Sequence, residues 1–151
     1  MATEWRLRPA TDADRNFLFD LHRRAMREYV EPIWGWDDVV QRRLFDDRFV
    51  SRQSQVIQVD GENVGLLQLD ERPGEVVLGL IELLPAWQGK GIGTAIIRSL
   101  LAQGKPVSLR VLRRNPRAAA LYERLGFRIV RRAPEHLYMR AEPANAAADG
   151  R

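Results

Sequence analysis

The chain has 151 residues, a net charge of +4, 45% hydrophobic residues and 29% charged residues, values that are ordinary for a globular domain. This length fits one domain with a hydrophobic core. No apolar run reaches the roughly 18 residues that a membrane span needs. The absence of cysteine excludes disulfides and a cysteine nucleophile. The N-terminus has no apolar signal core, so we expect a cytoplasmic protein without membrane contact.

Basic residues are concentrated in the C-terminal third. Residues 105–140 carry 10 basic and 2 acidic side chains, a net charge of +8, whereas residues 1–104 carry 13 basic and 16 acidic side chains, a net charge of −3. Such a segment suits a polyanionic partner, either a nucleic acid or a phosphorylated cofactor. A solvated arginine-rich face explains the same charge, and charge alone favours that interpretation. The two histidines, His22 and His136, lie far apart in unrelated contexts and give no metal-binding pattern.

The first half of the chain predicts a strand, two helices and a hairpin. A short strand is expected over residues 4–8, and Thr11 caps a helix whose apolar residues recur at helical spacing. Pro32 and Gly35 are expected to end this helix. Asp37 or Asp38 then begins a second one, whose predicted apolar set is Val39, Val40, Leu44 and Phe45. A hairpin follows, with strands over 56–59 and 64–69 joined by the turn "DGEN".

The second half alternates strands with helices. Residues 75–85, "EVVLGLIELLP", are apolar on both faces and predict a central, covered strand. A helix is expected from Ile92 to about Gly104, a strand over 106–112, and a short helix from Asn115 and Pro116 to Gly126. Strands at "FRIVRR" and "HLYMR" end the domain at residue 140. Residues 141–151 predict a disordered tail, because they have little to bury.

The stretch "PAWQGKGIG", residues 85–93, has three glycines at alternate positions between a strand and a helix. The P-loop pattern fails, because Leu84 stands where its first glycine belongs. The dinucleotide pattern G-x-G-x-x-G fails as well, because Thr94 or Ile96 occupies its last glycine position. Backbone N–H groups of a tight glycine loop at a helix start nevertheless suit a pyrophosphate. A strand-to-helix turn without a ligand is the alternative, but such a turn needs only one or two glycines.

Two segments together resemble the GCN5-related N-acetyltransferase (GNAT) superfamily. Gln88, Gly91 and Gly93 match the Gln/Arg-x-x-Gly-x-Gly/Ala loop that binds the acetyl-CoA pyrophosphate, and "NPRAAALYERLGF", residues 115–127, is similar to the second family segment. The resemblance implies a GNAT fold of the α/β (α+β) class over residues 1–140. That fold has a mixed, mostly antiparallel sheet of six to seven strands, flanked by about four helices and splayed between the fourth and fifth strands.

Glu82 is the first candidate catalytic residue. It is the only charge in an otherwise apolar strand, and burial favours the neutral form of a carboxyl group, as suits a general base. In similar enzymes a carboxylate on this strand takes the ammonium proton, directly or through water. The alternative is a strand-end glutamate that reaches solvent or pairs with an arginine.

Tyr122 is the second candidate, because it matches the family tyrosine that lies near the coenzyme sulfur. Its hydroxyl can protonate the departing thiolate, whereas the alternative is an aromatic residue that packs on the sheet. The family also has a bulge at the backbone of Leu83 and Leu84, where an N–H can hold the thioester oxygen. Asn115 is expected to bind the pantetheine amides, to cap the helix, or to do both.

The resemblance implies acetyl-CoA as the cofactor and no metal. The full set of predicted coenzyme-binding residues is Leu83, Leu84, Gln88, Gly89, Lys90, Gly91, Ile92, Gly93, Thr94, Asn115, Arg117 and Tyr122. Lys90, Arg117 and the neighbouring Arg113 and Arg114 are candidates to meet the coenzyme phosphates. This accounts for the basic segment better than a nucleic acid does, because that segment contains the second coenzyme motif.

The joint between the first two helices lines the acceptor cleft in this fold. The predicted acceptor-binding residues are Tyr29, Glu31, Trp34 and Trp36. The two tryptophans either form an aromatic wall for an amine or plug the core, since aromatic rings serve both roles.

The sequence thus predicts an N-acetyltransferase that transfers an acetyl group from acetyl-CoA to a primary amine within a ternary complex. The expected partners are acetyl-CoA and an amine acceptor, with no nucleic acid and no membrane, in a monomer or homodimer. The alternative function is a non-catalytic acyl-CoA sensor, which keeps the glycine loop but does not need Glu82 and Tyr122. A nucleic-acid-binding protein is a weaker alternative, because the basic residues lack interleaved aromatic residues.

Overall fold

The computed structural model describes residues 4–143, which form two compact units. The N-terminal unit consists of the described residues up to Asp70 together with Leu80–Gly93. The C-terminal unit consists of Glu71–Gly79 together with the described residues from Thr94 onward. Of the predicted tail, residues 144–151 lie outside the described residues. The last strand continues to Ala141, one residue beyond the predicted end of the domain.

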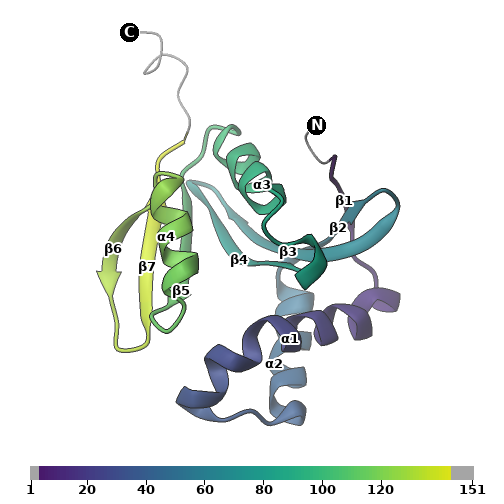
Figure 1. The fold of residues 1–151 in the computed structure, drawn as a ribbon. Coiled ribbons are helices and arrows are strands. Elements are labelled where there is room, and N and C mark those ends of the chain that lie inside the picture. Colours follow the sequence, from purple (N-terminus) through teal and green to yellow (C-terminus); the bar gives the residue numbers. More distant parts are fainter. Residues whose placement is uncertain (1–3, 144–151) are drawn as a thin grey trace, which may run out of the picture. The chain divides into compact units, whose positions relative to one another are not determined.

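Seven strands and four α-helices alternate along the described chain (Figure 1). In order they are β1 (Arg6–Pro9), α1 (Arg15–Trp34), α2 (Asp38–Ser51), β2 (Gln53–Val59), β3 (Glu62–Arg72), β4 (Glu75–Leu83), α3 (Ile92–Leu101), β5 (Val107–Leu112), α4 (Pro116–Arg124), β6 (Arg128–Arg132) and β7 (His136–Ala141). Short 3₁₀ turns precede α1 at Asp12–Asp14 and follow β4 at Pro85–Trp87. The predicted order of elements is confirmed.

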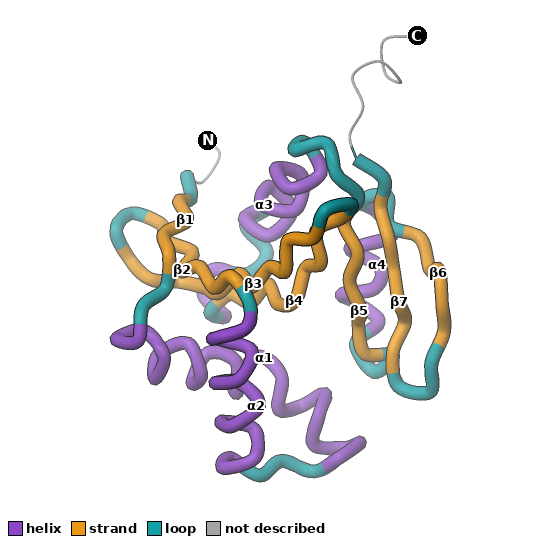
Figure 2. The backbone as a smooth tube through the Cα atoms, turned by 180° about the vertical axis from the view of Figure 1, so that it is seen from behind, coloured by secondary structure: helices purple, strands orange, loops and turns teal. Residues whose placement is uncertain are grey.

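The strands form one mixed sheet in the order β1-β2-β3-β4-β5-β7-β6 (Figure 2). The pairs β1–β2, β2–β3, β5–β7 and β6–β7 are antiparallel, and β4–β5 is parallel. Strands β4 and β5 pair only at Val76↔Val107 and Val77↔Ser108, so most of β4 diverges from β5. The predicted splay between the fourth and fifth strands is therefore confirmed, and β4 is central as expected.

The β2–β3 hairpin has a two-residue turn at Asp60 and Gly61. Both residues have positive φ, 53° and 80°, as a type I′ turn requires. Glycine adopts this conformation at little cost, and aspartate tolerates it. The turn pairs Val59 with Glu62, and a shift of register between Ile57 and Gln58 then places Val56 opposite Leu66; both of these side chains are fully buried.

The core of the N-terminal unit is built where α1 and α2 pack against β2 and β3. Its buried residues are Leu18, Phe19, Leu21, Phe45, Val56 and Leu66. Within α2 only Phe45 is buried, so the prediction for the rest of its apolar set is wrong: Val39 is 68% exposed, and Val40 and Leu44 are exposed as well. Two aromatic rings hold this helix to the core: Phe45 meets Phe19 edge to face at 5.6 Å, and the partly buried Phe49 packs beside Phe45 at 6.2 Å.

Helix α1 continues through Pro32, contrary to the predicted break at that residue. It ends at Gly35, whose φ is 74° and whose N–H donates to the carbonyl of Glu31 at 2.9 Å. Proline disturbs a helix at its own N–H and in the preceding turn, but only two helical residues, Ile33 and Trp34, follow Pro32 here, so little helix depends on it. Asp37 caps α2, since its carboxylate accepts from the N–H groups of Val39 and Val40.

In the C-terminal unit, α4 packs on β5 and β7. Asn115 caps α4 through a bond from the N–H of Ala118 to its Oδ1 at 3.2 Å, with Pro116 at the first helical position. Gly126, with φ 98°, follows the last turn. The predicted start and end of this helix are confirmed, and both depend on local residues with one strongly preferred conformation.

A partly buried ion pair anchors the chain between β1 and α1. Arg8 binds both carboxylate oxygens of Asp14 at 2.8 and 2.9 Å, and the Thr11 N–H also donates to Asp14 at 2.8 Å. The Arg8 hydrogen bonds, with help from Thr11, lower the pKa of Asp14 from 3.8 to about 2. The ionised carboxylate is therefore bound more tightly in the folded chain than in the unfolded chain, and it stabilises the fold above pH 3.8.

We expect Asp14→Asn to lower the free energy of unfolding by about 1–2 kcal/mol at pH 7, because it removes this pair. The difference from the wild type should shrink as the pH falls from about 4 through 2, where Asp14 becomes protonated. Urea unfolding at several pH values measures both effects. Asp12→Asn, an exposed carboxylate in the same turn, is the control. An equal loss in both variants would contradict the assignment.

Candidate active site

Glu82 lies near the end of β4 and is only 7% exposed. The neighbouring strand β3 approaches it closely because residue 65 is glycine: a Cβ there would lie 2.5 Å from the carbonyl oxygen of Glu82. The N–H of Leu84 donates to the carbonyl of Val64 at 2.9 Å and holds β4 to β3 directly beyond Glu82. The carboxylate is thus held on a tightly packed strand, out of contact with bulk water.

The partner of Glu82 is His22, on the buried face of α1. Nδ1 of His22 lies 2.9 Å from Oε2 and 3.1 Å from Oε1 of Glu82. The His22 ring also packs against Phe45 of α2, with ring centroids 5.6 Å apart. Neither alternative considered for Glu82, solvent contact or an arginine partner, is what the structure contains.

Sequence analysis missed the contact between His22 and Glu82. The signal was present, because His22 follows Leu18 by four residues and Leu21 by one, so it falls on the apolar stripe of α1. A polar residue on a buried stripe needs a partner. The sequence alone could not identify that partner, which lies 60 residues away on another element.

The geometry of this pair constrains its protons. When Glu82 is ionised, its carboxylate only accepts hydrogen bonds, and Nδ1 of His22 then carries the hydrogen and donates it. Two protonation states of His22 satisfy this requirement: the neutral tautomer, with Nε2 as an acceptor, and the imidazolium. In both states one N–H lies between the two oxygens and fixes the orientation of the carboxylate, while each oxygen keeps a lone pair for another proton.

The glycine loop connects β4 to α3 in an exposed segment, Gln88–Gly91. Gly89 and Gly91 have φ values of 73° and 83°, so the path of the backbone requires glycine at both positions. The Gln88 side chain donates to the carbonyl of Leu83 at 3.0 Å and ties the loop to the end of β4. Lys90 is exposed.

Gly93, in the first turn of α3, is a different case. Its φ is not in the left-handed region, and a Cβ built on it would make only ordinary contact with Ile81, at 3.9 Å. Neither backbone conformation nor crowding within the chain explains a glycine at this position. Close approach of a ligand is a remaining physical reason for glycine.

The backbone at Leu83 and Leu84 is partly engaged in the sheet and loop. The N–H of Leu84 donates to Val64 and the carbonyl of Leu83 accepts from Gln88, as described above. Because the N–H of Leu84 is already bonded to Val64, the N–H of Leu83 is the remaining candidate for the oxyanion donor.

The remaining predicted coenzyme residues lie on α4 in the C-terminal unit. Asn115 and Tyr122 are seven residues apart and share one helix face with Ala119. The half-buried Tyr122 ring meets Phe127 edge to face at 5.6 Å, so its packing role is present in the structure. Asn115 uses Oδ1 as a helix cap, which leaves its amide hydrogens for another partner. Arg117 is exposed.

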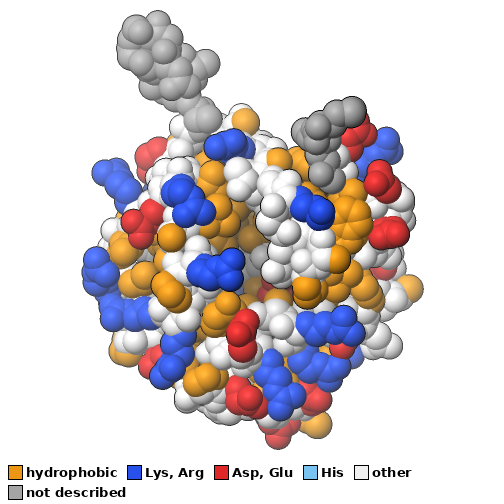
Figure 3. Space-filling model, in the orientation of Figure 1, with side chains coloured by type: hydrophobic (Ala, Val, Ile, Leu, Met, Phe, Trp, Pro, Cys, Tyr) orange, Lys and Arg blue, Asp and Glu red, His pale blue; other side chains and the backbone are white. Residues whose placement is uncertain are grey.

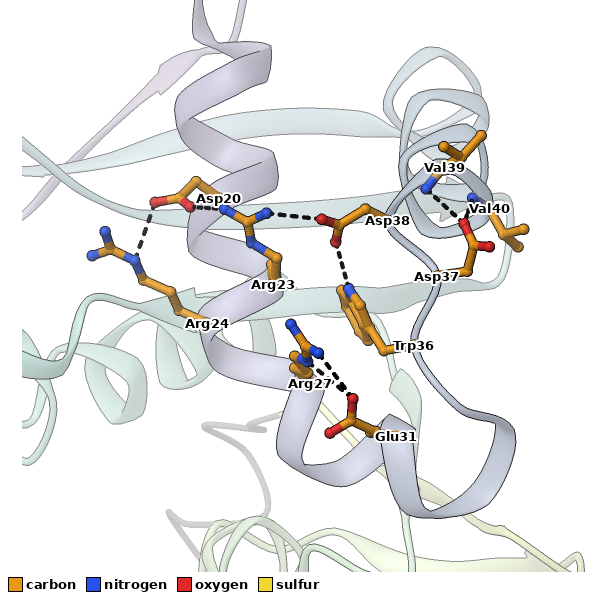
Figure 4. A network of polar contacts seen from close by, with 10 residues as sticks. All are labelled: Asp20, Arg23, Arg24, Arg27, Glu31, Trp36, Asp37, Asp38, Val39 and Val40. Atoms are coloured by element: carbon orange, nitrogen blue, oxygen red, sulfur yellow. Dashed lines mark hydrogen bonds and ion pairs between the residues drawn. The ribbon is translucent and has the colours of Figure 1, made fainter.

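The predicted acceptor residues lie in the last turns of α1 or directly after it, and Figure 4 shows two of them, Glu31 and Trp36. Trp34 is 58% exposed and does not plug the core. The half-buried Trp36 donates its indole N–H to Asp38 at 2.7 Å, and this hydrogen bond and the nearby Arg23 lower the pKa of Asp38. Glu31 accepts from Arg27 at 3.0 Å. An open groove of about 450 Å³ follows this stretch of α1, lined by Arg23, Arg24, Arg27, Glu28 and Glu31.

Comparison with known proteins identifies the class of protein. The chain matches the acetyltransferase (GNAT) family over residues 15–127, which is most of its length, and it belongs to that family. Members of the family use acetyl-CoA. No match was found among curated proteins. Within residues 4–143, no helix is long and apolar enough to cross a membrane, and no group of three metal-binding side chains comes together.

Solved structures with the same fold include several acetyltransferases. The PaiA N-acetyltransferase from Thermoplasma acidophilum, solved with coenzyme A, has a TM-score of 0.72 and 14% identity over 92% of this chain and 99% of its own. An acetyltransferase from Thermus thermophilus has a TM-score of 0.73 and 20% identity, with 93% and 98% covered. A spermidine N-acetyltransferase mutant from Vibrio cholerae has a TM-score of 0.65 and 21% identity, with 90% and 92% covered. At these identities the likeness shows the fold.

The close approach of β3 to Glu82 predicts that the fold does not tolerate a side chain at position 65. We expect Gly65→Ala to lower the free energy of unfolding by about 1–3 kcal/mol, because the new methyl group overlaps backbone that cannot move freely. Urea unfolding measures the loss. Gly74→Ala, where a Cβ has open space, is the control and should change stability little. A Gly65→Ala protein as stable as the control would show that the strands are less tightly packed than described.

Proposed function

We propose that the protein transfers an acetyl group from acetyl-CoA to a primary amine, directly within a ternary complex. The observation that carries this proposal is the buried Glu82, held by His22 at the end of the strand that leads into the glycine loop. A carboxylate is costly to bury, and a chain that only binds a coenzyme has no need of one at this position. The absence of cysteine excludes a cysteinyl acyl-enzyme.

The glycine loop and the second motif on α4 are each proposed to supply residues that contact the coenzyme. Gly93 supports this assignment, since the free space at its missing Cβ and its ordinary φ leave close ligand approach as the reason for glycine. The backbone of Gly89–Thr94 would meet the pyrophosphate at the start of α3. Lys90 and Arg117 would add charge, and the free amide hydrogens of Asn115 would meet the pantetheine amides. When bound, acetyl-CoA supplies an acetyl thioester.

Three groups of the chain are proposed to accept or donate a proton or a hydrogen bond in this reaction. An amine arrives as an ammonium ion and must lose a proton before it can attack. Glu82 is proposed to accept that proton, directly or through water, on the lone pairs that His22 does not use. The N–H of Leu83 is proposed as the oxyanion donor, and the Tyr122 hydroxyl as the proton donor to the leaving sulfur.

His22 is proposed as a positioning residue for Glu82. Its single N–H holds the carboxylate in one orientation, so less reorganisation is needed when the proton is transferred. The packing of the imidazole on Phe45 fixes the histidine in turn. The acceptor is proposed to approach from the end of α1, where the exposed Trp34 and the carboxylate of Glu31 suit an amine.

Substitution of the pair tests the catalytic proposal. We expect Glu82→Gln to lower kcat/KM by about 10²–10⁴-fold at pH 7, because the amide cannot accept the proton. His22→Asn keeps an N–H near the Nδ1 position and should retain most activity, whereas His22→Ala should lose more than the asparagine variant. Release of free thiol from acetyl-CoA, measured with a panel of amines, gives kcat/KM for each of the three variants.

Coenzyme A binding by the same variants, measured as a rise in melting temperature, is the control and should be unchanged. If coenzyme A binds but no amine supports turnover in the wild type, the protein is an acyl-CoA sensor and the enzymatic proposal fails. Mass detection of the acetylated product across an unbiased acceptor library would identify the amine.

The glycine loop generates a separate prediction. Gly93→Ala should keep or slightly raise the melting temperature, since alanine is the better helix former and its Cβ has room. The same change should weaken coenzyme A binding at least tenfold by filling the space that the ligand needs. Isothermal titration calorimetry measures the affinity, with Gly74→Ala as the control. Unchanged affinity would place the pyrophosphate elsewhere.

A further inference from the structure

Three side chains form a row across the strands of the C-terminal unit. In the registered pairs Arg110 of β5 lies opposite Tyr138 of β7, and Tyr138 lies opposite Arg131 of β6. Directly opposite residues in antiparallel strands have their Cβ atoms about 5 Å apart and project from the same face. A tyrosine therefore stands between two arginines.

This row lies on the face of the strands that α4 does not cover. The alternate pairs Val107↔Ala141 and Leu109↔Met139 are buried on the opposite face. Figure 1 shows α4 in front of β5 and β7, and from behind, in Figure 2, the strands lie in front of α4. Arg110 and Arg131 are exposed, so their remaining donors face solvent.

The arginines converge on the tyrosine. The guanidinium carbon of Arg131 lies 3.8 Å from the centroid of the Tyr138 ring, a stacked contact. A hydrogen bond from Arg110 and the charge of Arg131 lower the pKa of Tyr138. Burial and the charge of Arg110 lower the pKa of His136, the next residue on the same face of β7. His136 is thus neutral at pH 7 and adds a polar group without adding charge.

The positive charge of the row is not neutralised. Within the described part of the chain, no carboxylate lies at ion-pair distance from Arg110 or Arg131. Arg140, one position along on the same face, is bound by Glu75 at 3.4 Å and by Glu142 at 3.1 Å. The acidic residues available on this face therefore pair with its neighbour, and two guanidinium groups flank a phenol with most of their donors unused.

We propose that Arg110, Tyr138 and Arg131 form a binding site for a small phosphate-type oxyanion. Guanidinium groups bind such anions through paired N–H donors, and two of them beside a hydroxyl supply several donors in one place. A tetrahedral dianion matches their combined charge. The site takes either a free phosphate or the phosphate group of a small molecule.

A nucleic acid strand fits this surface less well. Binding of single strands depends on aromatic rings with a free face on which bases stack. The guanidinium of Arg131 covers one face of the Tyr138 ring. Tyr138 is the only aromatic residue of the row, and the ring beside it is that of His136. The charges suit a compact anion better than a stacked base.

Phosphate binding to the protein without acetyl-CoA tests the proposal, so its outcome is independent of catalysis. We expect inorganic phosphate near ten times its dissociation constant to raise the melting temperature by about 3–6 °C over sodium chloride of equal ionic strength. Phosphate should also raise the pKa of Tyr138 by neutralising the arginines. The absorbance of phenolate against pH reports that pKa as the difference between the wild type and Tyr138→Phe.

Arg110→Gln and Arg131→Gln should each abolish the phosphate-specific rise and return the Tyr138 titration toward its ordinary range. Arg128→Gln, an exposed arginine on the same face but outside the row, is the matched control and should retain the response. The proposal is overturned by an equal response to chloride and phosphate, or by a response that survives Arg110→Gln. The other contrary result is a short oligonucleotide that binds more tightly than phosphate, with an affinity that falls as much with Arg128→Gln as with Arg110→Gln. That result would also overturn the proposal, in favour of a general polyanion surface.

Discussion

The contact between His22 and Glu82 is the constraint on which the N-terminal unit depends. A carboxylate buried on a central strand is tolerated only with a partner, and breaking such a pair by removing one member typically costs about 3–5 kcal/mol. The partner comes from α1, and its ring is seated by Phe45 of α2. The glycine at position 65 lets β3 close against the backbone of Glu82. Two helices and two strands are therefore held in place around one hydrogen bond, so the requirements of stability and of the proposed chemistry coincide there.

The glycine loop shows how a single motif can contain residues with different physical origins. Gly89 and Gly91 have positive φ values, so any chain following this path needs glycine at those positions. Gly93 has neither a positive φ nor a crowded Cβ position. The sequence motif treats all three as equivalent, but only at Gly93 do backbone conformation and packing leave the choice of glycine unexplained. The proposed coenzyme contact would explain it, and an enzyme and a non-catalytic sensor would share that contact.

The sequence predicted what depends on neighbouring residues. The Asp60–Gly61 turn, the Asn115 cap and the splayed pairing of β4 with β5 follow from local conformational preference or from the family motifs. It failed where distant contacts decide the outcome. Val40 and Leu44 have the four-residue spacing of a buried helix face, yet both are exposed, and α2 packs on the core through Phe45 and Phe49. The sequence does not predict the pairing of His22, because its partner is 60 residues away. Spacing along one element shows which residues share a face, and only the packing of several elements shows what that face meets.

The same limit applies to charge. The net +8 of residues 105–140 left open whether the basic side chains have a partner or are simply solvated. In the N-terminal unit, arginines such as Arg8 and Arg23 lie against carboxylates of nearby residues and are largely neutralised. In the C-terminal unit there are fewer carboxylates, and Lys and Arg predominate over the surface of α4 and β6 in Figure 3. The basic residues then divide by face. Those around α4 lie beside the second coenzyme motif, whereas Arg110 and Arg131 lie on the face of the strands that α4 does not cover. The basic segment therefore contains two groups of side chains on opposite faces, and the proposed oxyanion site would account for the group on the open face.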